Sequence, residues 1–158
     1  MDAFSSEGAR CELVIFPILR EIYKRYTDET ALWVQKSFAV DAKLSSTPDY
    51  MISRKPELGK TILESPLLLL VETKRNDFEQ GWGQCLAELI APSLNHHSRP
   101  VYGIVTDGKL WEFGRLQDQV FTKNAASYTI SNLETLFCVL NGLLDLATQN
   151  LEVPALAE

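Results

Sequence analysis

The chain has 158 residues, of which 46% are hydrophobic and 23% charged, and its formal net charge is −6. This length and composition predict one globular domain with a sizeable core. The acidic balance argues against a large sequence-independent nucleic-acid surface, because affinity for a polyanion depends on Lys and Arg.

Location and redox state can be inferred from what the chain contains. Its apolar runs are too short to span a bilayer, and its first residues lack the basic and apolar pattern of an export signal. We therefore expect a cytoplasmic location and no membrane partner.

The three cysteines, at positions 11, 85 and 138, are odd in number and widely spaced, which fits neither a disulfide framework nor a zinc site. We expect them to be reduced core residues.

The N-terminal segment has helical spacing of its apolar residues. Ser6 is a suitable cap for a helix that begins near Glu7. Pro17 lacks the backbone N–H that a helix interior needs, so the helix either kinks there or restarts near Phe16. Residues 27–30 form a polar connection.

Strand composition follows. Residues 31–40 are rich in β-forming side chains, and a second short strand at 47–53 is opened by Pro48, which a strand tolerates at its start. Residues 54–65 are loop-like. A strand ending near Lys74 follows, and then a helix at 78–91 that is capped by Asn76 and Asp77 and ended by Pro92. Strands at 100–105 and 110–113 are joined by an Asp-Gly hairpin turn at 106–109. A further strand is predicted near 119–121, and a last helix at 133–146 is capped by Ser131.

The most informative stretch is the aliphatic run at 67–71 followed by Glu72, Thr73 and Lys74. Such a run predicts a strand buried on both faces, although a buried helical segment has a similar pattern. Side chains alternate along a strand, so Glu72 and Lys74 are expected on the same face at its end. Carboxylates beside a lysine suit a hard divalent cation and a phosphodiester.

The order of elements and these motifs resemble the PD-(D/E)XK nuclease superfamily. Pro48-Asp49 matches the first half of its signature and Glu72-Thr73-Lys74 the second. The segment from Ser6 to Leu19 is similar to the opening helix of the nuclease domain in type I restriction subunits, and residues 102–113 resemble the hairpin of the same relatives. The resemblance covers roughly residues 5 to 115. It implies an α/β, restriction-endonuclease-like αβββαβ core, with a central mixed sheet flanked by helices.

The resemblance also implies a chemistry for each residue. Asp49, Glu72 and the carbonyl of Thr73 are expected to hold Mg²⁺, with Mn²⁺ as an alternative, and Glu7 to bind a second ion or an outer water. Lys74 is expected to orient the attacking water and offset phosphorane charge. Gln84 is expected to hydrogen-bond the water or the nucleic-acid backbone.

Several alternatives stay open. Glu12 competes with Glu7 for the same role, and Asp41-Ala42-Lys43 repeats the acid-x-lysine spacing without an amphipathic helix after it. Relatives often carry a tyrosine four positions after the helix glutamine, whereas this chain has Glu88. His96 and His97 are adjacent and point in different directions, which favours a loop role. The aromatic residues Trp82, Tyr102 and Trp111 are expected to pack in the core or the hairpin rather than stack on bases.

Two functional hypotheses follow. The first is a metal-dependent nuclease that hydrolyses phosphodiester bonds, in DNA rather than RNA, formed by residues 1–148 as a single domain with a loose tail at 149–158. Because the chain has no separate recognition module, this nuclease is expected to act as a homodimer or with a DNA-binding partner protein. The second is a catalytically inactive nuclease-like domain used for nucleic-acid binding or protein interaction, which the acidic net charge and Glu88 favour.

Overall fold

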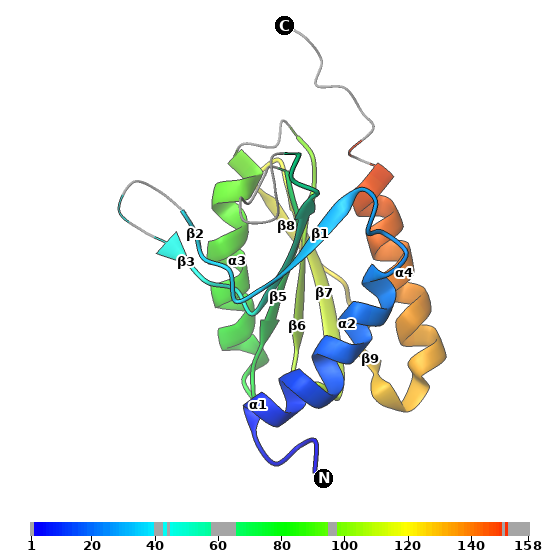
Figure 1. The fold of residues 1–158 in the computed structure, drawn as a ribbon. Helices are drawn as coiled ribbons and strands as arrows, with labels where there is room; N and C mark the ends of the chain where they lie inside the picture. Colours follow the sequence, from blue (N-terminus) through cyan, green and yellow to red (C-terminus); the bar gives the residue numbers. More distant parts are fainter. Residues whose placement is uncertain are drawn as a thin grey trace, which may run out of the picture.

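A curled mixed sheet forms the centre of the computed structural model, and helices flank it on both faces (Figure 1). The structure describes residues 2–39, 43, 45–57, 66–94, 98–149 and 151. The histidine pair 96–97, residues 40–42 of the second acid-x-lysine motif and most of the C-terminal tail therefore lie outside the described residues. The α/β class predicted from the sequence is confirmed.

The main sheet has the strand order β1-β4-β5-β6-β7-β8, and β9 pairs with β7. Neighbouring strands run antiparallel except for β5 and β6, which are parallel and are connected through helix α3. Parallel neighbours need such a crossover, whereas antiparallel ones can be joined by a hairpin. The strands are β1 (Thr30–Val34), β4 (Tyr50–Arg54), β5 (Leu67–Thr73), β6 (Val101–Thr106), β7 (Leu110–Gln117), β8 (Val120–Lys123) and β9 (Tyr128–Thr129).

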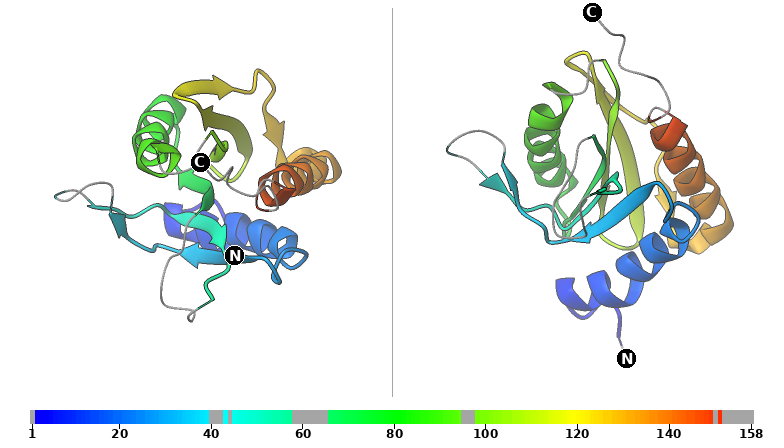
Figure 2. Two further views of the ribbon diagram at one scale, coloured as in Figure 1. Left: turned by 90° about the horizontal axis from the view of Figure 1, so that it is seen from above. Right: turned by 45° about the horizontal axis from the view of Figure 1, so that its top comes forward.

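Strand β5 is the central element, and all seven of its residues are buried. Leu69 and Val71 belong to a core cluster that includes residues of helices α2 (Phe16–Tyr23) and α4 (Leu133–Gln149). Leu70 belongs to a second cluster, with residues of α3 (Phe78–Leu94). Figure 2 shows the same division, with α3 on one side of the sheet and α2 and α4 on the other. From Leu69 to Val71, consecutive residues of β5 thus face different helices, as strand alternation requires.

The N-terminal helical segment has three parts. Helix α1 (Glu7–Arg10) is capped by Ser6, whose side chain accepts a hydrogen bond from the backbone N–H of Ala9 at 3.0 Å. A π-helical stretch, Cys11–Ile15, connects it to α2, which restarts at Phe16 with Pro17 in its first turn. The predicted restart is confirmed, and the π-helical stretch explains how the chain accommodates a proline without a break.

One strand prediction requires correction. The strand expected at 31–40 is divided, because Gln35 has a positive φ of 47° and ends β1, and Phe38–Ala39 forms β2 instead. Strand β2 pairs with β3 (Ser45–Ser46) in a separate two-stranded ribbon. This ribbon projects on the same side of the molecule as α3 (Figure 1).

Helix boundaries also differ from expectation. Helix α3 continues beyond Pro92 to Leu94, because a proline so near the C-terminal end disturbs only the last turn. Its N-terminus is capped by Asp77, whose Oδ1 accepts from Gln80 N at 2.9 Å. At the start of α4 the capping side chain is that of Asn132 and not Ser131, whose hydroxyl bonds to Thr129.

The expectation that no apolar run can span a bilayer is also corrected. The helical stretch Ile130–Gln149 is long and apolar enough by length and composition, with a mean hydropathy of 1.3. Core helices of soluble proteins can have the same length and apolar composition, so one such helix is weak evidence of a membrane location. Leu136, Leu140 and Leu144 from this helix are indeed buried in the core.

The aromatic residues are buried as expected, but the cysteines are only partly so. Trp82, Tyr102 and Trp111 are buried in the core, as predicted. The three cysteines are free, but only Cys85 is fully buried and Cys138 is exposed on α4. The prediction of three core cysteines is therefore wrong for Cys138, which lies on the outer side of an amphipathic helix.

Candidate acidic site at the end of strand β5

The end of β5 carries a buried pair of carboxyl groups. Glu72 is 1% exposed and Glu88, from the facing turn of α3, is 3% exposed. The two side chains are hydrogen-bonded to each other, and the Ser46 hydroxyl from β3 also donates to Glu88 Oε1. Glu72 Oε1 and Glu88 Oε2 receive no hydrogen bond from any donor group among the described residues. Two acids in contact therefore retain oxygen atoms that can accept a proton or a cation.

The environment of Glu72 strongly favours its neutral form. Burial is the largest cause, followed by the hydrogen bond with Glu88 and the negative charges of Glu88 and Asp49, and together they raise the pKa of Glu72 to about 10. Lys74 acts in the opposite direction and lowers this pKa. The same two glutamates, together with burial, raise the pKa of the Cys85 thiol, so this thiol is protonated and unreactive at neutral pH.

Lys74 lies on the same side of the sheet as Glu72. Its aliphatic stem packs on Gly81 of α3, where a Cβ atom would come within 3.0 Å of Lys74 Cγ and 2.7 Å of Val105 Cγ1. The absence of a side chain at Gly81 therefore allows the lysine stem to lie between β5 and α3. The alternation argument, which placed Glu72 and Lys74 on one face, agrees with these contacts.

Asp49 supports the strand end from the neighbouring chain segment. It precedes β4, and its Oδ2 accepts hydrogen bonds from the backbone N–H of Thr73 at 2.8 Å and from the Thr73 hydroxyl at 2.6 Å. Asp49 is also close enough to Glu72 for its charge to raise the Glu72 pKa. The two acids of the sequence signature, 23 positions apart, thus meet at the end of β5: Asp49 binds Thr73, and Glu72 is the residue before Thr73.

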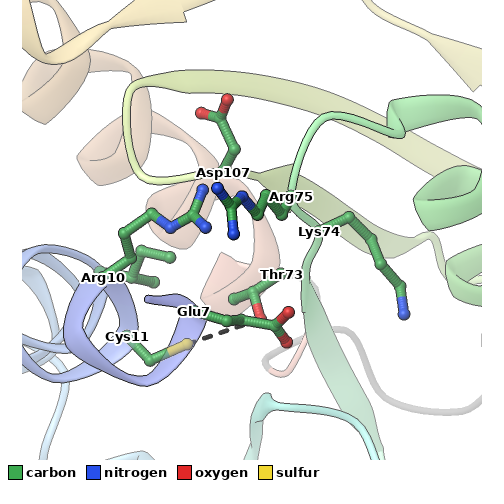
Figure 3. Close-up of a pocket in the computed structure, with 8 residues that line it drawn as sticks. Glu7, Arg10, Cys11, Thr73, Lys74, Arg75 and Asp107 are labelled. Carbon is green, nitrogen blue, oxygen red and sulfur yellow. Dashed lines mark hydrogen bonds between the residues drawn. The ribbon is translucent and has the colours of Figure 1, made fainter. Parts of the chain in front are cut away.

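Glu7 lies elsewhere. It lines a small pocket on the opposite side of β5, between α1 and the hairpin turn that follows β6 (Figure 3). Thr73 is shared by the two sides, since its hydroxyl also contacts Cys11 Sγ at 3.6 Å. Glu12 is exposed on the π-helical stretch, where its charge contributes to the raised pKa of Tyr50. The structure therefore brings Glu72 and Lys74 together with Glu88, and Glu7 together with Thr73, but it does not gather all four predicted metal groups.

Gln84 is half-buried on α3, one helical turn before Glu88. Within the described part of the chain its side chain makes no hydrogen bond. The helix face that carries it is the one that covers Glu72, because residues four apart on a helix lie above one another.

Glu88 was not among the predicted site residues, although it stands where the resembled family often has a tyrosine. The available signal was an acidic residue on the apolar face of a helix, where charged side chains are rare unless paired. Across the described ranges, no group of three or more His, Cys, Asp or Glu side chains is arranged closely enough to hold a metal ion. The contact of Glu72 with Glu88 is therefore a pair, with Asp49 beside it.

Comparison of the chain with protein-family models, curated proteins and solved structures found no match in any of the three.

Proposed function

We propose that this protein is a metal-dependent nuclease of the PD-(D/E)XK superfamily that hydrolyses phosphodiester bonds, in DNA rather than RNA. The observation that carries the proposal is the convergence of Glu72, Lys74 and Glu88 at the end of a central buried strand, with Asp49 bound to Thr73 between them. Carboxylates that cost free energy to bury are retained where a ligand offsets that cost.

The order of elements supports the fold assignment. A helical segment, the antiparallel strands β1, β4 and β5, the crossover helix α3 and the parallel strand β6 follow one another as an αβββαβ core requires. The β2-β3 ribbon is an insertion between β1 and β4. In this assignment Glu72 belongs to the strand that precedes the crossover helix, Lys74 directly follows that strand, and α3, which carries Glu88, covers Glu72.

The donor set fits a magnesium-like ion. Glu72 Oε1 and Glu88 Oε2 are buried oxygens without a hydrogen-bond donor among the described residues, and hard divalent cations prefer carboxylate oxygens. Glu72 and Glu88 would hold Mg²⁺ or Mn²⁺ as a two-carboxylate site, because no third acid among the described residues is arranged to complete a larger metal-binding group. When bound, the ion supplies Lewis acidity and a nucleophile at neutral pH. Glu88 thus replaces Glu7 in the proposal, and Asp49 supports the site through its hydrogen bonds with Thr73.

Lys74 has the position of the charge-stabilising group. Its ammonium extends from the same face as Glu72, away from the Glu7 pocket (Figure 3). A cation there stabilises the additional negative charge that develops on phosphorus during attack. Gln84, half-buried on the helix that covers the pair, is placed to orient the water or the strand being cut. The net charge of −6 implies that a second copy or a DNA-binding partner supplies much of the affinity.

One observation favours the alternative of an inactive nuclease-like domain. Glu72 is almost completely covered by α3, and its raised pKa keeps it protonated at neutral pH. A protonated Glu72 carries no negative charge to attract a cation. Metal binding, and not the fold, therefore distinguishes the two hypotheses.

The deciding experiment compares the wild-type protein with Glu72→Gln and Lys74→Met on labelled single- and double-stranded DNA and RNA. Each substrate is incubated with Mg²⁺, with Mn²⁺ and with a chelator. Metal-dependent cleavage that both variants lose supports the nuclease. The matched control is Glu134→Gln, which removes an exposed carboxylate from the first turn of α4.

Two results would contradict the proposal. Cleavage that persists in both variants points to a contaminating enzyme. Nucleic-acid binding without cleavage at any metal concentration favours the inactive domain.

A further inference from the structure

A second site is suggested by a buried arginine on the other side of β5. Arg10, at the end of α1, is 7% exposed, and its Nη2 has no hydrogen-bond partner within the described part of the chain. The hydrogen bond that its side chain does make there runs from Nε to the Ser6 carbonyl, at 3.3 Å. An arginine almost never lies buried with an unpaired guanidinium nitrogen, because a guanidinium has five donors to satisfy and its burial is costly. A ligand that accepts from it is therefore the simplest explanation.

The guanidinium of Arg10 lines the small pocket between α1, the end of β5 and the β6-β7 turn (Figure 3). Arg75, two residues beyond the end of β5, lines the same pocket and is exposed at its mouth. Figure 3 draws the two guanidinium groups next to one another. Like charges brought together in a partly buried pocket repel unless an anion lies between them.

The turn that closes the pocket holds Arg10 in place. Gly108 has a φ of 91°, and a Cβ at this position would lie 3.7 Å from Arg10 Cβ and 3.5 Å from the Phe4 ring. Asp107 begins the turn and lines the pocket, but its Oδ1 accepts from the backbone N–H groups of Lys109 and Leu110 at 2.9 Å each. That oxygen is committed to the turn.

The charges of the pocket favour an anion. Arg10, Lys74 and Arg75 contribute three positive charges, and Glu7 and Asp107 contribute two negative ones. The Lys74 ammonium points out of the pocket and Glu7 is exposed at its edge, so the buried Arg10 forms the inner wall and the exposed Arg75 lies at the mouth. As the side chains lie, the space between them does not admit a sphere the size of a water molecule, so an anion reaches Arg10 only when the exposed Arg75 side chain moves aside.

We propose that Arg10 and Arg75 bind a phosphate group of nucleic acid, next to the phosphate that the acidic site attacks. Planar guanidinium groups bind phosphate through two parallel hydrogen bonds, which Arg10 and Arg75 are placed to form from two sides. The identity of the ligand as nucleic acid rests on the proposed function, whereas the anion site rests on the pocket alone. The phosphate is either a diester within a strand or a monoester at a strand end.

The test measures binding of inorganic phosphate by calorimetry in the presence of a chelator, so that the acidic site does not contribute. Arg75→Gln, a change at an exposed residue, is expected to weaken binding at least fivefold. Arg10→Lys keeps the charge but loses the planar fork and is expected to weaken binding several-fold. Asp107→Asn keeps the Oδ1 acceptor of the turn, removes a competing negative charge and is expected to strengthen binding.

The control is Lys24→Gln, which removes one exposed positive charge at the far end of α2. Fourteen residues separate Lys24 from Arg10, about 20 Å along a helical segment. Equal losses in Lys24→Gln and Arg75→Gln would reduce the effect to net charge and overturn the proposal, as would unchanged binding in Arg75→Gln. Folding of each variant is checked by circular dichroism, and Arg75→Gln carries the test if Arg10→Lys does not fold.

Competition then identifies the source of the phosphate. Displacement of inorganic phosphate by a 5′-phosphorylated oligonucleotide, but not by its 5′-hydroxyl counterpart, assigns the pocket to strand ends. Equal displacement by circular DNA assigns it to internal diesters. If no nucleic acid displaces the phosphate, the assignment to nucleic acid is overturned, whatever the cleavage assays show. Cleavage with unchanged phosphate binding in Arg75→Gln would conversely overturn the pocket and leave the nuclease in place.

Discussion

The two sides of β5 at its C-terminal end have opposite electrostatic character, although the residues that begin them are neighbours in the chain. Towards α3, Glu72 meets Glu88, and burial together with this second carboxyl group raises the pKa of Glu72. Towards α1, Thr73 leads to a pocket walled by Arg10 and Arg75. Strand alternation separates consecutive side chains onto two faces, so a tripeptide can serve a cation on one face and an anion on the other.

This difference matters for a phosphodiesterase, because its substrate carries negative charge that needs both a metal held by acids and cations that position the backbone. In the proposed function, the acidic side would supply the first requirement and the arginine side the second. The following variants test whether the two sides are distinct in this way.

The largest expected effect is on the acidic side. Glu88→Gln should lower metal-dependent cleavage at least 100-fold, as Glu72→Gln should, because loss of one preorganised polar group from a catalytic site costs about 10²–10³ in rate. The measurement is the initial rate at saturating Mg²⁺, with Glu134→Gln as the control. A Glu88→Gln variant with wild-type activity would show that the helix acid only pairs with Glu72.

The packing of α3 on this side can be tested with two glycines of the same helix. Gly81→Ala should destabilise the protein by about 1–3 kcal/mol, because the added methyl group overlaps Val105 and the Lys74 stem. Gly83→Ala meets no atom within 4 Å and should stabilise it by about 0.5–1 kcal/mol through helix propensity. Denaturant unfolding of both variants measures the difference. Equal effects would mean that α3 does not rest on Lys74.

In the absence of metal, the raised pKa of Glu72 makes the free energy of unfolding depend on pH. Glu72 has a higher pKa in the folded protein than its ordinary value of 4.5, so its contribution is fully present at low pH and is lost as pH rises through the folded pKa. The free energy of unfolding should therefore fall between about pH 5 and pH 9 in wild type, and Glu72→Gln should remove most of this slope. At pH 8 the wild-type protein must take up a proton on Glu72 to fold, whereas the Gln side chain is neutral at every pH. We therefore expect Glu72→Gln to be more stable at this pH, by about 1–3 kcal/mol, the usual cost of an unsatisfied buried polar group.

This pH experiment is carried out by urea unfolding in chelator at three pH values. An equal slope in wild type and Glu72→Gln would mean that Glu72 is ionised in the folded protein. Added Mg²⁺ should reduce the difference, because a bound cation takes the place of the proton.

The smallest effects concern the helix caps, one on each side. Ser6→Ala removes the acceptor for Ala9 N at the start of α1, and Asp77→Ala removes the acceptor for Gln80 N at the start of α3. Each should cost about 1 kcal/mol. Ser6→Ala should additionally weaken phosphate binding, because α1 carries Arg10, whereas Asp77→Ala should leave phosphate binding unchanged. The opposite result would place the phosphate on the α3 side.

The sequence by itself determined the elements with local causes. The aliphatic run 67–71 predicted the buried strand, Asp107-Gly108 predicted the hairpin, and Ser6 predicted a helix start, because each depends on residues close in the chain. The alternation of side chains along a strand was also enough to place Glu72 and Lys74 on one face. The boundary at Gln35 and the continuation of α3 past Pro92 were missed, since neighbouring elements and not local propensity set them.

Only the tertiary structure decided which distant side chains meet. Glu88 lies 16 positions after Glu72, and although its place on the apolar face of a helix indicates burial, its local sequence does not show that it meets Glu72. The same holds for Arg10, whose burial depends on the close approach of the β6-β7 turn, 98 residues further along the chain at Gly108. Side-chain pairs of this kind result from how helices pack on a sheet, which depends on contacts across the whole domain and not on spacing along the chain.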